Sequence, residues 1–271
     1  MDNTILRKVQ LTQLEIYKQV NDIAQKNHIQ VYLYAGTLLG AVRHQGFIPW
    51  DDDLDIAVPR EEYAHLMECL QTELSEAYWL QNYETDPQYW QPFAKVRKKG
   101  TLFKEAALEN VEDSKCGIWI DIFPLDKAPK NKGFGISVRR YLAETIALSL
   151  RKEILKQPMG SFSRRYIPAL LFWGIFPVKM RKKIQCKVMK WGGKRKAPYY
   201  VDLSGTEPLR KLIFPAEWFQ SQEKLHFEDG EYGVPKAYAQ FLTQLYGDYM
   251  TPPPENKRGG HTMDDQFPVI V

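Results

Sequence analysis

The densest group of chemically useful side chains lies in "PWDDDLDIAV" (49–58), where four of five consecutive positions are aspartate. Carboxylates this close repel one another, and each resists leaving water. Leu54, Ile56 and Val58 alternate with other residues, as side chains do along a half-buried strand. We therefore predict a strand over 51–58 that presents Asp51, Asp53 and Asp55 on one face, where they could hold a hard divalent cation such as Mg²⁺.

Two other interpretations of this acidic stretch compete with a magnesium site. It could be a solvated loop, but the regular apolar alternation argues against that. It could also be a calcium loop of the EF-hand type, with Asp51, Asp53 and Asp55 at the first, third and fifth positions. That loop needs glycine at its sixth position, where Ile56 stands, and Pro59 is a further obstacle, so we reject it.

A third carboxylate lies in "GIWIDIFPLD" (117–126), where Asp121 stands alone among large apolar residues. An unpaired carboxylate in such a strand would be costly to bury. Asp121 could be satisfied by backbone N–H groups or by an arginine. Alternatively, its strand lies beside that of Asp53 and Asp55, and Asp121 completes the metal site.

The turn upstream of the acidic stretch could bind phosphate. "YAGTLLGAVRH" (34–44) follows an apolar strand, and Gly36 permits a close backbone approach. We expect Thr37 to cap a short helix over 38–43, whose free N–H groups could hold phosphate oxygens. Phosphate at a helix end, linked by a metal to nearby carboxylates, is the arrangement that phosphoryl transfer requires.

Helices and strands must position these residues. Apolar spacing predicts helices over 5–27, from Arg60 onward and near 235–246, and strands over 29–35, in "PFAKVRKKGT" (92–101) and in "GIWIDIFPLD". The fold class is α/β or α+β, with helices dominating the second half. Lys95 and Arg97 share one strand face and could neutralise diphosphate charge, or could simply be solvated. The proline- and glycine-rich stretch 249–262 could form a lid that carries Tyr249 and His261, or could be a plain tail.

The charge of the chain is distributed unevenly. Residues 151–196 carry fourteen Lys and Arg against the single Glu153, whereas the other residues carry 23 basic against 32 acidic side chains. One part of the molecule should therefore attract anions. The three cysteines form no CxxC pair, the start lacks a secretory signal, and no apolar segment approaches the ~20 residues that span a bilayer. These features favour a cytoplasmic protein.

The motif "GTLLGAVRHQGFIPWDDDLDI" (36–56) closely resembles the central motif of the LicD family of phosphocholine transferases, which also resembles the fukutin-related proteins. Both look like members of the nucleotidyltransferase superfamily. The resemblance implies a mixed sheet flanked by helices, with a single catalytic domain over 1–271 and its core at 29–126. A basic helical segment over 151–196 and a C-terminal helix and possible lid over 234–271 complete this division.

The resemblance also implies an activity: transfer of phosphocholine from CDP-choline to a sugar hydroxyl of a cell-wall glycan precursor of the teichoic acid type. By that resemblance Asp53, Asp55 and Asp121 hold Mg²⁺, while the phosphate-binding residues are Gly36, Thr37, Arg43, Lys95 and Arg97. The acceptor would be a lipid-linked glycan, and no nucleic-acid partner is expected.

Three other functions stay open at this point. The chain could transfer the nucleoside monophosphate itself, it could be a metal-dependent glycosyltransferase, or it could be a membrane-binding module without activity. The apolar stretch "YIPALLFWGIFPV" (166–178), flanked by basic residues, fits either shallow insertion at an anionic inner leaflet or a buried core helix.

Overall fold

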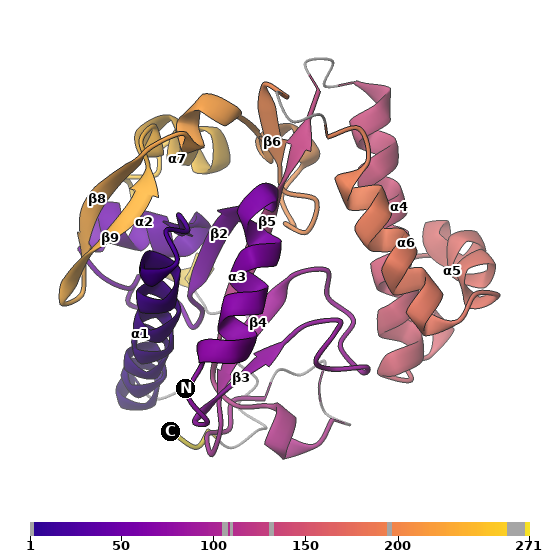
Figure 1. Cartoon of the computed structure of the whole chain (residues 1–271), viewed down its shortest axis with the longest axis horizontal. Coiled ribbons are helices and arrows are strands. Elements are labelled where there is room, and N and C mark those ends of the chain that lie inside the picture. Colours follow the sequence, from indigo (N-terminus) through magenta and orange to yellow (C-terminus); the bar gives the residue numbers. More distant parts are fainter. Residues whose placement is uncertain (1–2, 105–107, 109–110, 130–132, 194–196, 259–268) are drawn as a thin grey trace. The chain divides into compact units, whose positions relative to one another are not determined.

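The computed structural model describes residues 3–271 except 105–107, 109–110, 130–132, 194–196 and 259–268. Its contacts divide the chain into two compact units, which are described here one at a time. Unit 1 comprises Met1–Leu80, Lys95–Pro124 and Glu217–Val271, and unit 2 comprises Gln81–Ala94 and Leu125–Ala216. Both units contain helices and strands, which confirms the mixed α/β class (Figure 1).

The sheet of unit 1 has the strand order β1–β2–β5–β4–β3. Leu33 of β1 lies opposite Ile56 of β2 in an antiparallel pair. The strands are β1 (Tyr32–Leu33), β2 (Asp55–Pro59), β3 (Tyr78–Gln81), β4 (Ala94–Lys98) and β5 (Trp119–Ala128), of which the last continues into unit 2. The strand predicted over 29–35 is therefore present but short. The prediction of a strand over 51–58 is wrong in its first half, because β2 begins only at Asp55.

The helices described in unit 1 are α1 (Asn3–Lys26), α2 (Ala35–His44), α3 (Arg60–Glu73) and α7 (Tyr238–Tyr246). Helix α3 begins directly after Pro59, and its first turn carries two glutamates, which suit the positive end of the helix dipole. Helices α1 and α3 contact each other. A hairpin of β8 (Gln222–Phe227) and β9 (Gly230–Pro235) lies against β1.

The central strands of unit 1 separate an apolar face from a polar one. On β5 and just before it, Ile118, Ile120 and Ile122 are fully buried, together with Ile56 on β2 and Val96 on β4. Side chains alternate along a strand, so the residues between these point to the other face. That face carries the polar side chains of the three strands, and it is where the candidate site lies.

Unit 2 is mainly helical, as predicted for the basic segment. It contains α4 (Phe134–Ile154), α5 (Ile167–Gly174), α6 (Val178–Lys190), β6 (Tyr199–Val201) and β7 (Ile213–Pro215). Helix α4 packs against both α5 and α6, with Ile146, Leu150 and Trp173 in a shared core. Residues Asp126–Ala128 of β5 pair antiparallel with β6, which pairs in turn with β7.

Short 3₁₀ helices occur at Asp113–Lys115, Met159–Ser161, Arg164–Tyr166, Leu209–Lys211, Ala216–Phe219 and Glu255–Lys257. Among the described residues, no helix has both the length and the apolar character that crossing a bilayer would require.

Candidate active site

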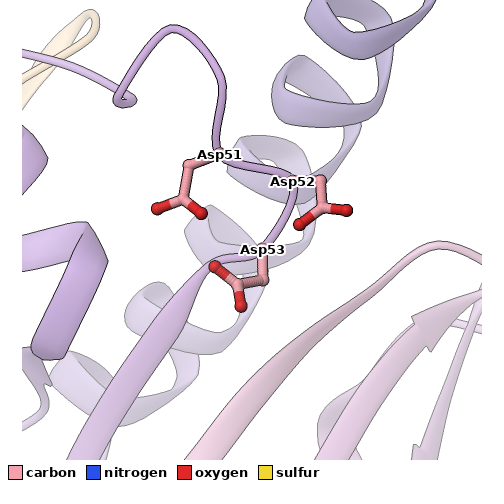
Figure 2. Close-up of side chains that lie close together, drawn as sticks. All are labelled: Asp51, Asp52 and Asp53. Carbon is pink, nitrogen blue, oxygen red and sulfur yellow. The ribbon is translucent and has the colours of Figure 1, made fainter. Parts of the chain in front are cut away.

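The acidic residues form a turn that leads into β2 (Figure 2). Residues 51–54 have no regular secondary structure, because side chains of α1 hold their backbone. The Gln10 Nε2 donates to the Asp51 carbonyl at 2.9 Å, and the Gln13 Nε2 donates to the Asp52 carbonyl at 2.8 Å. The predicted single face with Asp51, Asp53 and Asp55 therefore does not form as an extended strand.

Carboxylate oxygens nevertheless converge on this turn. One oxygen each from Asp51, Asp52 and Asp53 lies within 4.8 Å of the others. Asp51 and Asp52 are buried, and Asp53 is partly exposed. Carboxylate oxygens are the ligands that a hard cation such as Mg²⁺ prefers, so these three residues could hold one.

The pKa values of Asp51 and Asp55 are raised, which shows that negative charge is costly at this turn. Burial, together with the neighbouring Asp52 carboxylate, raises the pKa of Asp51 to about 7. Burial and the charges of Asp53, Asp121 and Asp51 hold the pKa of Asp55 well above its ordinary value, although Lys95 opposes that shift. The site thus carries more negative charge than its own residues compensate, and a divalent cation would compensate it.

Asp121 joins this group from the neighbouring strand β5. Its backbone N–H donates to the Leu54 carbonyl at 2.9 Å, which fixes the strand beside the acidic turn. Its carboxylate lies 2.8 Å from the Lys95 Nζ and is mostly buried. Asp121 is thus paired with a basic side chain, a lysine and not an arginine, and its charge also raises the pKa of Asp55. Its part in a metal site stays a prediction.

The side chains of Lys95 and Arg97 form a buried row with Trp119 on the polar face. Each basic residue is only 2% exposed, so the interpretation as an ordinary solvated face is wrong. The Lys95 Nζ lies 4.4 Å and the Arg97 Cζ 4.9 Å from the centre of the Trp119 ring. Arg97 also donates to the Gly117 carbonyl at 2.8 Å. The ring stabilises both cations away from water, and Lys95 is directed toward Asp121.

The phosphate-binding turn has a different geometry from the one predicted. Helix α2 begins at Ala35, and Thr37 lies inside it instead of capping it. The Thr37 Oγ1 accepts a hydrogen bond from the Asp55 N–H at 2.8 Å, so it ties α2 to the start of β2. A Cβ atom built on Gly36 would lie 2.9 Å from the Asp51 Oδ2. Gly36 therefore leaves room for the Asp51 carboxylate at the first turn of α2, whereas phosphate binding there stays a prediction.

The C-terminal segment after α7 contacts the residues that precede the acidic turn. Arg43 donates to the Tyr249 carbonyl at 2.8 Å, and the Arg258 guanidinium lies 4.6 Å from the centre of the Trp50 ring. Burial, and then the charge of Arg258, lower the pKa of Arg43. Arg43 and Tyr249 thus contact each other, whereas His261 lies outside the described residues. The role of this segment as a lid stays a prediction.

Sequence reasoning missed the contribution of Gln10 and Gln13. Both are buried, Gln13 completely, and they lie on the inner face of α1, which is mostly apolar. Glutamine at an inward position of an amphipathic helix is unusual, and that position was the available signal. It also missed Asp52, which strand alternation placed away from Asp51 and Asp53 but whose carboxylate lies close to theirs.

Comparisons with known proteins show which sequences this chain resembles. Residues 28–140 match the family model described as LicD/FKTN/FKRP, nucleotidyltransferase domain. The chain is 28% identical over 270 residues to lipopolysaccharide cholinephosphotransferase LicD of Haemophilus influenzae. The aligned residues cover 98% of this chain and 99% of that protein. An uncharacterized protein of Rickettsia prowazekii is 46% identical over 63 residues, or 23% of this chain and 24% of its own length. An uncharacterized protein of Rickettsia typhi is 44% identical over 66 residues, which are 24% of this chain and 21% of that protein. The matched region contains the acidic turn, the Gly36–Thr37 turn and the Asp121 strand, so residues 28–140 are similar to this family of nucleotidyltransferase domains.

Proposed function

We propose that this protein transfers phosphocholine from CDP-choline to a sugar hydroxyl of a cell-wall glycan precursor of the teichoic acid type, with Mg²⁺ as its cofactor. The observation that carries the proposal is the excess of buried negative charge around Asp51, Asp53, Asp55 and Asp121 beside the glycine turn of α2. The full-length similarity to a Haemophilus cholinephosphotransferase supports phosphocholine as the transferred group.

The carboxylates of the acidic turn, with Asp55 and Asp121, would hold the cation. Bound Mg²⁺ would supply positive charge to the diphosphate of the donor, which is the chief requirement of phosphoryl transfer. Gly36 would leave room for the phosphate oxygens at the first turn of α2, where Asp51 now approaches. Lys95, kept in place by Trp119, would add a further positive charge.

The reaction itself exchanges one phosphorus–oxygen bond for another. The acceptor hydroxyl oxygen bonds to the phosphorus that carries choline, and the bond from that phosphorus to the bridging oxygen breaks. Cytidine monophosphate leaves with the bridging oxygen. The hydroxyl proton needs a base, and Asp121 is our candidate because its carboxylate reaches the polar face of the sheet.

We also propose that the protein works as a peripheral protein at the inner face of the cell membrane. The support comes from α5 and the turn after it in unit 2. There Leu171, Phe172 and Ile175 are 60%, 52% and 76% exposed, and basic residues precede and follow them. A lipid-linked acceptor would make that location useful.

One incubation tests the transfer. Purified protein would be mixed with Mg²⁺, CDP-choline and a panel of glycan acceptors, and the products analysed by mass spectrometry. We expect cytidine monophosphate and an acceptor that has gained phosphocholine. Release of pyrophosphate would instead indicate transfer of the nucleoside monophosphate, and incorporation of a sugar from a nucleotide sugar would indicate a glycosyltransferase.

Two controls make the result specific. Excess chelator should stop the reaction if Mg²⁺ is required. A parallel reaction with CDP-ethanolamine compares kcat/KM for the two donors with the same acceptor. We expect the choline donor to be preferred, and equal values would contradict the assignment of choline as the selected head group.

A further inference from the structure

Helix α6 presents a row of lysines along one side of a groove in unit 2. Lys179, Lys183, Lys187 and Lys190 recur at helical spacing, and all four are exposed. They line a groove of about 1290 Å³. With the described residues of the chain, these four side chains form no ion pair or hydrogen bond, so their charge faces solvent without a carboxylate partner.

Two other ionisable side chains in the lining have partners within the chain. The buried Lys182 donates to the carbonyls of Asp86 and Pro87, and Glu153 pairs with Arg181. The remaining carboxylate in the lining is that of the exposed Glu84. The groove therefore has a positive surplus that an anionic ligand would neutralise.

The floor of the groove is apolar. Tyr83, Pro87, Ile154 and Val178 contribute carbon surface between the lysines, and the lysine stems add to it. An inorganic anion would use the charges and leave this surface exposed. A ligand that combines an anionic head with a hydrocarbon part would use both.

The chain itself links this groove to the exposed apolar residues of α5. Ile175 lies just after α5, and Val178 and Lys179, in the first turn of α6, already line the groove. Between Ser163 and Gly193 the sequence contains no Asp or Glu. Exposed apolar side chains and lysines thus follow one another along the chain from α5 into the lining of the groove. Such a succession suits contact with a lipid that bears a charged head group.

We propose that this α6 groove is a binding site for a phosphate-bearing lipid, with the phosphate at Lys179, Lys183 and Lys187 and the adjoining hydrocarbon on the apolar floor. The inference concerns recognition of the lipid and not the transfer chemistry. Its test therefore uses no donor, and its failure leaves the proposed transfer activity unaffected.

The chain contains its own reporter of occupancy. Cys186 lines the groove and is exposed, whereas Cys69 and Cys116 are buried. The rate at which N-ethylmaleimide modifies Cys186, followed by peptide mass spectrometry, should fall when a ligand fills the groove. The probe is dihexanoyl phosphatidic acid, used below the concentration at which it forms micelles.

We expect saturable protection of Cys186 by this lipid, and about tenfold weaker apparent affinity in the Lys183→Gln/Lys187→Gln variant. The matched control is Lys8→Gln/Lys236→Gln, which removes two exposed lysines from unit 1 and should leave the affinity unchanged. Rates are compared with and without lipid in each variant, so that any change in intrinsic thiol reactivity cancels.

Three outcomes would overturn the proposal. Equal protection by inorganic pyrophosphate would show that the hydrocarbon part is not recognised. Equal protection by dihexanoyl phosphatidylcholine would show that the net negative charge is not recognised. Undiminished protection in the Lys183→Gln/Lys187→Gln variant would remove the lysines from the site.

Discussion

At the scale of single residues, the candidate site is defined by charges that are costly without a ligand. Asp55 illustrates this, because burial and three neighbouring carboxylates raise its pKa while its backbone N–H is held by Thr37. A residue in this position destabilises the metal-free protein when it is ionised. Such a cost is expected where function, and not stability, selects the residue.

Replacing Asp55 with asparagine should therefore separate stability from activity. The Asp55→Asn variant keeps the backbone bond to Thr37 but removes one negative charge. At neutral pH and without metal, we expect its free energy of unfolding to be about 1 kcal/mol higher than that of the wild type. Transfer activity should fall by at least the roughly 10–100-fold that changes around a metal site typically cost.

The sign of the pH dependence follows from the raised pKa. The folded protein holds the Asp55 proton more tightly than the unfolded chain does. The wild type therefore loses stability as the pH rises from the ordinary pKa of aspartate toward the raised pKa of Asp55 in the folded protein. Denaturant unfolding at several pH values should show the advantage of Asp55→Asn shrinking toward about pH 4, the ordinary range of aspartate. The exposed Asp22→Asn is the control. An advantage that persisted in acid, or full activity of Asp55→Asn, would contradict this description.

Gly36 gives a second residue-scale prediction. In Gly36→Ala the new Cβ would lie 2.9 Å from the Asp51 Oδ2, and the flexible carboxylate can move away. Alanine also favours the helix by up to about 1 kcal/mol. We therefore expect an unchanged or higher Tm but a clear loss of donor affinity, because the methyl group occupies space needed for phosphate. The control is Gly135→Ala in α4, where nothing lies within 4 Å. Equal KM values for both variants would exclude close phosphate approach at Gly36.

At the scale of elements, helix α1 positions the acidic turn. The Gln13 Nε2 donates to the Asp52 carbonyl at 2.8 Å, and its side chain is fully buried. Gln13→Met keeps the length of the side chain but leaves that carbonyl without this donor, which should cost about 1–3 kcal/mol. We also expect a lower kcat, because the backbone of the acidic turn would lose this hydrogen bond and its carboxylates would no longer be held in fixed positions.

The appropriate comparison for Gln13→Met is Gln25→Met on the exposed face of the same helix. Urea unfolding and initial rates at saturating donor would be measured for both variants. If Gln13→Met lost stability but kept the wild-type kcat, the helix would support the fold without positioning the site.

The elements also show how far the sequence determines the structure. Helices α1, α3 and α7 and strands β4 and β5 were predictable, because their periodicity is long and matches the faces that become buried. The turn at 51–54 was not, because the hydrogen bonds from Gln10 and Gln13 override the local alternation. The burial of Lys95 was also not predictable, since its partners Trp119 and Asp121 lie more than 20 residues away in the sequence.

At the scale of the whole molecule, the uneven charge distribution has a structural counterpart. The basic segment 151–196 belongs to unit 2, whereas the acidic turn belongs to unit 1. The apolar stretch 166–178 is partly buried and partly exposed in the structure, so it is not a core helix throughout. Leu170 and Trp173 are buried in the core of unit 2, whereas Leu171, Phe172 and Ile175 are exposed.

This division predicts membrane binding through a small set of side chains. Wild-type protein should float with anionic liposomes at low salt, and binding should weaken as salt screens the lysines and arginines. The Leu171→Gln/Ile175→Gln variant loses two exposed apolar side chains that would enter the lipid, each contributing on the order of 1 kcal/mol or more. We expect its partition coefficient to fall about tenfold or more.

The control is Leu11→Gln/Met250→Gln, which changes two residues of unit 1 that are 46% and 53% exposed and should bind like the wild type. Equal binding of both double variants, or no binding of the wild type at low salt, would show that the exposed end of α5 does not contact the bilayer.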